Sequence, residues 1–228
     1  LIPHAFYYSI RGPRKDERPP DVGLHSAWWG DSFTAFTQGC RRLSWLNTDS
    51  QHVCHIAILG EHHNLPWDSA KACFQNQIDF NYLDIDDLGR CEIGEDKTLR
   101  IVNQAYHVLV VSRDAPPNFH DKLKPIEGQI EIVYWDNDAG ALINRLQAVL
   151  PPSPFANIEA DSLRIRHIQK ADIDWYIVFN ETKTPLTAQL ELTGTTYLLN
   201  PSSEEVIDFS GDLELHGHQL LVIVQIKE

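Results

Sequence analysis

The residues best suited to chemistry lie close together near the start of the chain, between Pro3 and Asp31. This segment combines flat aromatic rings with arginines, histidines and acids, and its prolines and glycines interrupt regular structure. Aromatic rings cover the apolar faces of sugars, and charged side chains form directional hydrogen bonds with sugar hydroxyls. The segment therefore predicts a carbohydrate-binding loop. Its candidate substrate-binding residues are His4, Tyr7, Tyr8, Arg11, Arg14, Arg18, Trp28 and Trp29.

The alternative for this segment is an aromatic-rich loop that packs between domains, with its arginines in salt bridges. Its position after a strand suits a functional loop, because (β/α)8 barrels build active sites from loops at the carboxyl ends of their strands. A helix is predicted next, with an apolar stripe from Phe33 to Leu43 and with Asp31 or Ser32 as its N-cap. Residues 1–49 thus predict one strand–loop–helix unit, which cannot form a core alone.

Residues 50–150 alternate between strand and helix patterns. Strands are predicted at 52–59, 78–83, 105–111 and 129–134, and helices at 67–76, 117–125 and 138–149. Such alternation implies parallel βαβ units with right-handed crossovers. We therefore predict a small doubly wound, flavodoxin-like α/β domain.

Residues 151–228 open on a proline-rich linker and continue as short β segments. These segments are predicted at 162–167, 175–180, 187–192, 196–199, 205–208, 212–215 and 219–226. Their spacing and their turn residues are typical of an antiparallel β-sandwich. Trp175 and Tyr176 alternate along one strand, so core packing explains most of its aromatic residues. A carbohydrate-binding module would need an exposed aromatic platform, which the sequence does not locate.

Composition narrows the classes of partner. The 19 Lys+Arg and 32 Asp+Glu residues give a net charge of −13, which disfavours nucleic acids and anionic membranes. No apolar run reaches the roughly 18–20 residues that cross a bilayer. Phosphate-binding glycine motifs are absent and no cofactor is expected. Because the sequence has no methionine and opens on a strand-like run, we expect it to be a piece of a longer protein.

The four cysteines, Cys40, Cys54, Cys73 and Cys91, are widely spaced and form no C-x-x-C pair. We predict four buried thiols, with a disulfide left open as the alternative. Cys73 lies in a predicted helix rather than in a strand-to-helix elbow, so a catalytic thiol is not expected.

The histidines between residues 52 and 63 suggest zinc at first sight. If His52, Cys54 and His55 share one strand, however, they point to opposite faces and cannot close on one ion, so no metal site is expected. His62 and His63 follow the first predicted strand of the α/β domain, at the edge where such domains bind ligands. They are candidate ligand or interface residues.

Two runs in the sequence resemble the end of the catalytic barrel in a group of bacterial glycoside hydrolases, described as α-L-rhamnosidase-like or glycoside hydrolase family 2-like. The runs are HAFYYSIRGPRKDERPPDVGLHSAWW and, after it, CRRLSWLNTDSQHVCHIAIL. In that group, the resemblance implies, the last barrel strand and helix lead into a domain shaped like a class I glutamine amidotransferase. This domain is similar to the trimerisation domain of some bacterial β-galactosidases, and a β-sandwich follows it.

The resemblance implies a division into residues 1–49, the last unit of a (β/α)8 barrel, residues 50–150 and residues 151–228. Most glycosidases use two carboxylates, which the resemblance places on earlier barrel strands. Glu17 is a weak catalytic candidate, and with Asp21 it could instead bind a metal. The expected partners are a carbohydrate, the rest of the barrel and possible further copies of the chain. The alternatives are a structural or oligomerisation module without sugar contact and a ligand-sensing α/β domain.

Overall fold

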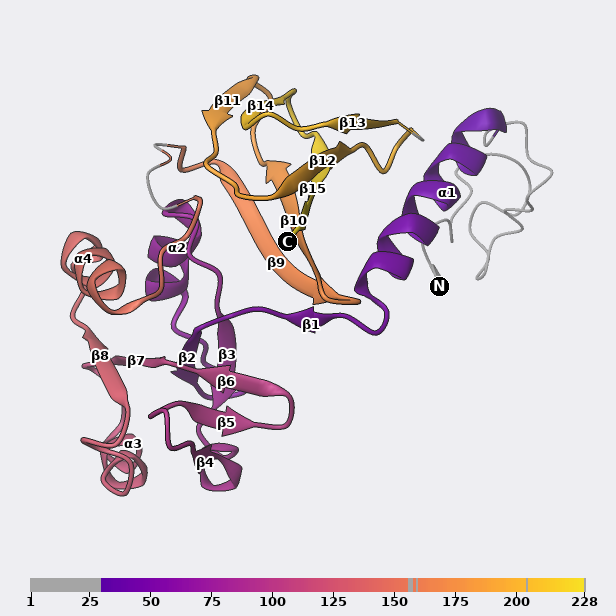
Figure 1. The fold of residues 1–228 in the computed structure, drawn as a ribbon. Coiled ribbons are helices and arrows are strands. Elements are labelled where there is room, and N and C mark those ends of the chain that lie inside the picture. Colours follow the sequence, from indigo (N-terminus) through magenta and orange to yellow (C-terminus); the bar gives the residue numbers. More distant parts are fainter. Residues whose placement is uncertain (1–29, 156–157, 159, 204, 228) are drawn as a thin grey trace, which may run out of the picture. The chain divides into compact units, whose positions relative to one another are not determined.

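The computed structural model describes residues 30–155, 158, 160–203 and 205–227. The chain divides into two compact units between Trp45 and Leu46, and each unit is described by itself. Within the described residues the strands form four sheets, one parallel and three antiparallel (Figure 1). The fold is therefore mixed α/β with mostly antiparallel sheets. In this part of the chain no helix is both long enough and apolar enough to span a membrane.

Helix α1, Gly30–Asn47, confirms the helix that the sequence predicts after the loop. It begins earlier than expected, so Asp31 and Ser32 lie in its first turn and the N-cap prediction is wrong. The reason is that a cap residue stands outside the helical backbone, whereas both residues are already part of it.

The parallel sheet forms the centre of the region between β2 and α4. Its strands lie in the order β3-β2-β7-β8 and each neighbouring pair is parallel. The strands are β2 (Ile56–Gly60), β3 (Asn81–Asp84), β7 (Val108–Ser112) and β8 (Glu131–Trp135), and the helices are α2 (Trp67–Gln75), α3 (Pro117–Leu123) and α4 (Ala139–Val149). All five residues of β2 are buried, as expected for an apolar strand covered on both faces. The predicted helices are confirmed with shifted ends.

The strand predicted over residues 52–59 is wrong in its first half. Residues Gln51–His52 form β1, which pairs with β9 (Leu163–Lys170) in a different sheet, and β2 begins only at Ile56. Residues 53–55 between them belong to neither strand, and the carbonyl of His55 accepts hydrogen bonds from two amides, those of His107 and Val108. His52 and Cys54 therefore do not share one strand.

A small three-stranded antiparallel sheet was not predicted. It consists of β4 (Glu92–Ile93), β5 (Leu99–Ile101) and β6 (Gln104–Tyr106), and a short helix, η1 (Leu88–Arg90), precedes it. Strands of two or three residues carry too little periodicity to be recognised in a sequence. For the same reason the strand predicted at 105–111 is two strands, β6 and β7, with His107 between them.

The rest of the chain forms a six-stranded and a two-stranded antiparallel sheet. The orders are β1-β9-β10-β15-β12-β13 and β11-β14. The strands are β9 (Leu163–Lys170), β10 (Ile173–Asn180), β11 (Leu186–Gln189), β12 (Thr195–Leu199), β13 (Val206–Asp208), β14 (Asp212–Leu215) and β15 (Leu220–Ile226). Both sheets contribute to one apolar cluster, which includes Val178, Ile223 and Leu215. Along β10 buried and half-buried residues alternate, which confirms that Trp175 and Tyr176 face opposite ways.

All four cysteines are free thiols, but they are not all buried as predicted. Cys54 and Cys73 are buried, whereas Cys40 and Cys91 are only half-buried. The reason is local: Cys91 follows η1 near the surface, and Cys40 lies on α1 among exposed and half-buried neighbours. Burial raises the pKa of both the Cys54 and the Cys73 thiols to about 12. These two thiols are structural, because a nucleophilic cysteine needs its thiolate near neutral pH.

Candidate functional site

The predicted carbohydrate-binding loop lies outside the described residues. This applies to all of its candidates, which are His4, Tyr7, Tyr8, Arg11, Arg14, Glu17, Arg18, Asp21, Trp28 and Trp29. Their proposed contacts with a substrate remain predictions.

His62 and His63 lie in a tight turn directly after β2. Backbone hydrogen bonds join Glu61 and Asn64 in both directions, with the Asn64 amide 2.9 Å from the Glu61 carbonyl. The turn exposes both imidazole rings, whose centroids are 4.6 Å apart in an edge-on arrangement. The carboxyl edge of a parallel sheet is where open α/β sheets bind ligands. The role of these two residues as ligand or interface residues stays a prediction.

A cleft of about 530 Å³ lies between α2 and the strands β9 and β10, and we call it the α2–β9 cleft. Ligand sites in proteins commonly have volumes of roughly 300–1,000 Å³. Four aromatic residues contribute to its lining, and they are Trp67, Phe74, Phe80 and Phe179. Trp67, the first residue of α2, is 63% exposed, whereas Phe80 is buried. The cleft therefore has an apolar wall and one large aromatic ring open to solvent.

The register of β9 and β10 explains how arginines reach the cleft. Arg164 pairs with Phe179 and Arg166 pairs with Ile177 across the two antiparallel strands. Because alternate residues of a strand share one face, both arginines and both apolar partners lie on the same face of the sheet. That face lines the cleft beside α2.

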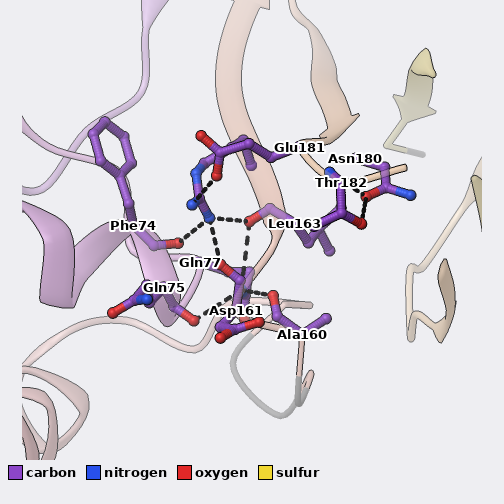
Figure 2. A network of polar contacts seen from close by, with 10 residues as sticks. Phe74, Gln75, Gln77, Ala160, Asp161, Leu163, Asn180, Glu181 and Thr182 are labelled. Carbon is purple, nitrogen blue, oxygen red and sulfur yellow. Dashed lines mark hydrogen bonds and ion pairs between the residues drawn. The ribbon is translucent and has the colours of Figure 1, made fainter. Parts of the chain in front are cut away.

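The guanidinium of Arg164 is held in place by contacts on several sides. Its Nη1 atom donates to the carbonyls of Asp161 at 2.7 Å, Phe74 at 3.2 Å and Leu163 at 3.2 Å, and Nη2 forms an ion pair with Glu181. Figure 2 shows Glu181, Phe74 and Leu163 gathered in this network. The guanidinium also lies over the Phe74 ring, 5.8 Å from its centroid. Arg164 thus joins α2 to β9.

The same network includes the side chain of Gln77, just after α2. Its Nε2 atom donates to the carbonyl of Ala160 at 2.6 Å and to that of Gln75 at 3.2 Å (Figure 2). Gln77 is only 8% exposed, so these hydrogen bonds satisfy a buried amide. Contacts from both Arg164 and Gln77 fix the position of α2 against β9 and so define the width of the cleft.

The charged side chains of the cleft are unequally engaged. Glu181 is paired with Arg164, and Asp79 Oδ2 lies 2.6 Å from His52 Nε2. In the described part of the chain, Lys71 and Arg166 have no carboxylate within ion-pair distance, and both are exposed. Among the described residues, the charges of these two cations are therefore not compensated by an ion pair.

A smaller cavity of about 250 Å³ lies nearby and is lined by His167, Tyr176 and Lys227 among others. Behind it Asp174, 2% exposed, accepts a hydrogen bond from His167 Nε2 at 2.7 Å and pairs with Lys227 Nζ at 2.6 Å. The Tyr176 ring stacks on His167 with centroids 4.4 Å apart, and its hydroxyl donates to Gln225 Oε1 at 3.0 Å. We call Asp174, His167, Lys227 and Tyr176 the Asp174 cluster.

Electrostatics within this cluster favour neutral His167 and ionised Asp174. Burial lowers the pKa of His167 more than the neighbouring carboxylate of Asp174 raises it. Burial by itself raises the pKa of Asp174, but its interactions with Lys227 and His167 outweigh it, and this pKa lies below its ordinary value. Burial also raises the pKa of Tyr176 to about 12. The cluster therefore holds a neutral imidazole against a buried carboxylate, whose Oδ2 atom contacts Lys227 as an ion pair but has no hydrogen-bond partner.

The side chains of the described residues are better suited to binding a ligand than to catalysing a reaction. Within them, no group of three or more histidines, cysteines or acids is arranged to hold a metal ion. The two carboxylates of the α2–β9 cleft, Asp79 and Glu181, are each engaged with a basic side chain. The arrangement can bind a small polar ligand through aromatic stacking and hydrogen bonds.

Sequence reasoning missed this cleft. One local signal was present, namely the alternating arginines of the run LRIRH in β9, which place two cations on one sheet face. The position of Trp67 at the start of α2 was a second signal. Neither signal could show that α2 packs beside β9, because their contact joins residues about ninety positions apart, such as Phe74 and Arg164.

Comparisons with known proteins found likeness in structure only. No protein-family model matches the sequence, and no curated protein matches it. Among solved structures, a rhamnosidase from Novosphingobium sp. PP1Y is similar with a TM-score of 0.61 and 14% identity. The similarity covers 87% of this chain and 25% of that one.

Two further structures show a weaker likeness. A β-galactosidase from Bacillus circulans sp. alkalophilus has a TM-score of 0.52 and 9% identity, over 83% of this chain and 44% of that chain. An exo-carrageenase of GH42 from Bacteroides ovatus has a TM-score of 0.51 and 10% identity, over 75% of this chain and 29% of that chain. The chain thus spans less than half the length of each of these three proteins. At such identities the likeness concerns the fold alone, and that fold is one found within glycoside hydrolases.

Proposed function

We propose that this chain is the C-terminal portion of a glycoside hydrolase, which supplies substrate-lining residues and non-catalytic domains. The observation that carries the proposal is the similarity to the rhamnosidase, which extends over 87% of this chain but only 25% of that enzyme. A match of this extent supports the proposal that the chain is a set of domains within a larger enzyme. The substrate would be a carbohydrate, and the names of the similar proteins suggest rhamnosides or galactosides for the first trials.

In this proposal, residues 1–49 are the last strand, loop and helix of a catalytic barrel, residues 50–150 a glutamine amidotransferase-like α/β domain and residues 151–228 a β-sandwich. The parallel order β3-β2-β7-β8 supports the second assignment, because it is the order with which flavodoxin-like sheets begin. The apolar cluster shared by the six-stranded and two-stranded sheets supports the third.

The loop between His4 and Trp29 supplies the sugar contacts in this proposal, and the catalytic carboxylates come from elsewhere in the barrel. Within the described residues, the acids of the α2–β9 cleft are engaged in ion pairs and hydrogen bonds, which suits binding better than proton transfer. In this proposal the described residues assist hydrolysis, and Glu17 stays a weak catalytic candidate.

The test uses Arg11→Ala and Trp28→Ala in the full-length protein that contains this chain. Each variant should lower kcat/KM for aryl glycosides by at least about tenfold, because each removes groups that orient the sugar. The matched control is Arg90→Ala, since Arg90 is an exposed arginine of η1 paired only with Asp87. If both loop variants hydrolyse as the wild type does, the loop does not contact substrate and an assembly role is favoured.

A further inference from the structure

We propose that the α2–β9 cleft is a separate binding site for one or two units of an acidic saccharide, such as a uronate. The inference goes beyond the loop of residues 1–29 and rests on the proposed function for its choice of a sugar. Its physical basis lies in three features of the cleft, which are an exposed ring, uncompensated cations and hydrogen bonds between its two sides.

The exposed ring is that of Trp67, which lines the cleft and is 63% exposed. Tryptophan presents a large flat apolar surface together with one polar donor, which suits a ligand that is apolar on one face and polar at its edges. Sugar rings have this character. Phe179 and Phe74 continue the apolar wall from Trp67 along β10 and α2.

The surplus of positive charge in the cleft favours acidic sugars over neutral ones. The three cations of its lining, Lys71, Arg164 and Arg166, exceed its two carboxylates, Asp79 and Glu181, although the whole chain carries a charge of −13. The guanidinium of Arg164 is already engaged, in an ion pair with Glu181 and in hydrogen bonds to backbone carbonyls. Lys71 and Arg166 remain to bind an anion, and the planar guanidinium of Arg166 can bind a carboxylate through two hydrogen bonds.

Hydrogen bonds connect the two sides of the cleft. The contacts of Arg164 with the carbonyls of Phe74 and Asp161 join α2 to the start of β9 before any ligand arrives. Preorganised sites lose little conformational entropy on binding. The volume of about 530 Å³ accommodates a small ligand rather than a long chain.

The experiment titrates the chain with digalacturonate and, in parallel, with neutral digalactose, by calorimetry and by the change in tryptophan fluorescence. We expect saturable binding of the acidic sugar at millimolar or lower concentration and at least about fivefold weaker binding of the neutral one. The Trp67→Ala variant should bind both sugars about tenfold more weakly. The Arg166→Gln variant should bind only the acidic sugar more weakly. The exposed control Arg90→Gln should leave the affinity for both sugars unchanged.

Circular dichroism and thermal unfolding confirm that each variant is folded before binding is measured. The inference is overturned if neither sugar saturates, if Trp67→Ala or Arg166→Gln binds digalacturonate as the wild type does, or if sodium sulfate displaces the sugar at equal concentration. Sulfate displacement would indicate a general anion site. Hydrolysis by the full-length protein is measured separately. The binding experiment can therefore contradict this site without contradicting the proposed function, and the hydrolysis experiment can contradict the proposed function without contradicting this site.

Discussion

Strands β2 and β7 of the parallel sheet and strand β10 of the six-stranded sheet are buried in different ways. Every residue of β2 is buried, and in β7 the residues from Val108 to Val111 are also buried. In β10, by contrast, buried and half-buried residues alternate, and the buried positions include the polar residues Asp174 and Asn180. In a strand covered on both faces, all side chains are buried in the core. In a strand covered on one face, the side chains of the other face can line a cleft.

This difference bears on where the proposed binding site lies. The half-buried face of β9 and β10 carries Arg164, Arg166 and Phe179 into the α2–β9 cleft, whereas the buried strands of the parallel sheet contribute no side chain to it. The parallel sheet offers its loops instead, as with His62 and His63. The buried Asp174 and its neighbour His167, both with lowered pKa values, lie in the six-stranded sheet.

One of the two largest effects is expected at the Asp174 cluster. Asp174→Ala removes the hydrogen-bond partner of His167 and the ion-pair partner of the largely exposed Lys227 from a site that is 2% exposed, and it should lower the free energy of unfolding by about 2–4 kcal/mol. Urea unfolding followed by circular dichroism measures this change. Asp174→Asn, which keeps the shape, should cost less, and equal stability of Asp174→Ala and wild type would show that the cluster is not needed.

In the parallel sheet, Leu109→Ala should cost about 2–4 kcal/mol, because Leu109 is fully buried and the change leaves a cavity. Its matched control is Ile177→Ala on β10, a half-buried position at the cleft, where about 1 kcal/mol or less is expected. Urea midpoints compare the two variants. Similar losses at both positions would contradict the difference between the two sheets.

The pH dependence of stability should come from the lowered pKa values of the cluster. Because burial lowers the pKa of folded His167, the unfolded chain binds a proton first as pH falls, and stability declines below about pH 6.5. The lowered pKa of Asp174 has the same sign and adds a further loss below about pH 4.

Thermal unfolding between about pH 7.5 and about pH 5 measures the first of these losses. His167→Gln should reduce the slope but not abolish it, since burial also lowers the pKa of His55. Stability that rises as the pH falls in this range would contradict a neutral, buried His167.

The smallest effect is expected on the surface. Lys122 and Asp86 form an ion pair at 2.6 Å, yet their side chains are 43% and 85% exposed. Lys122→Ala should therefore change the free energy of unfolding by less than about 1 kcal/mol, and the change should vanish at high salt. A loss as large as that of Leu109→Ala would mean that surface charge contributes far more than exposure suggests.

Much of the secondary structure was predictable because periodicity is local. The apolar run of β2 and the alternation of β10 both appear in the sequence as they do in the structure. The pairing of β1 with β9 was not predictable, since it joins Gln51 to Gln169 and depends on tertiary contacts. The α2–β9 cleft was missed for the same reason, whereas the loop of residues 1–29 stays a prediction from residue types alone.

We have proposed that this chain is part of an enzyme that hydrolyses glycosidic bonds. The most direct measurement is the release of the aryl group from a panel of aryl rhamnosides, galactosides and glucuronides by the full-length protein that contains this chain. The account predicts hydrolysis of at least one glycoside, with kcat/KM lowered by Arg11→Ala and Trp28→Ala but not by Arg90→Ala. Absence of hydrolysis across the panel by a folded, full-length protein would contradict it.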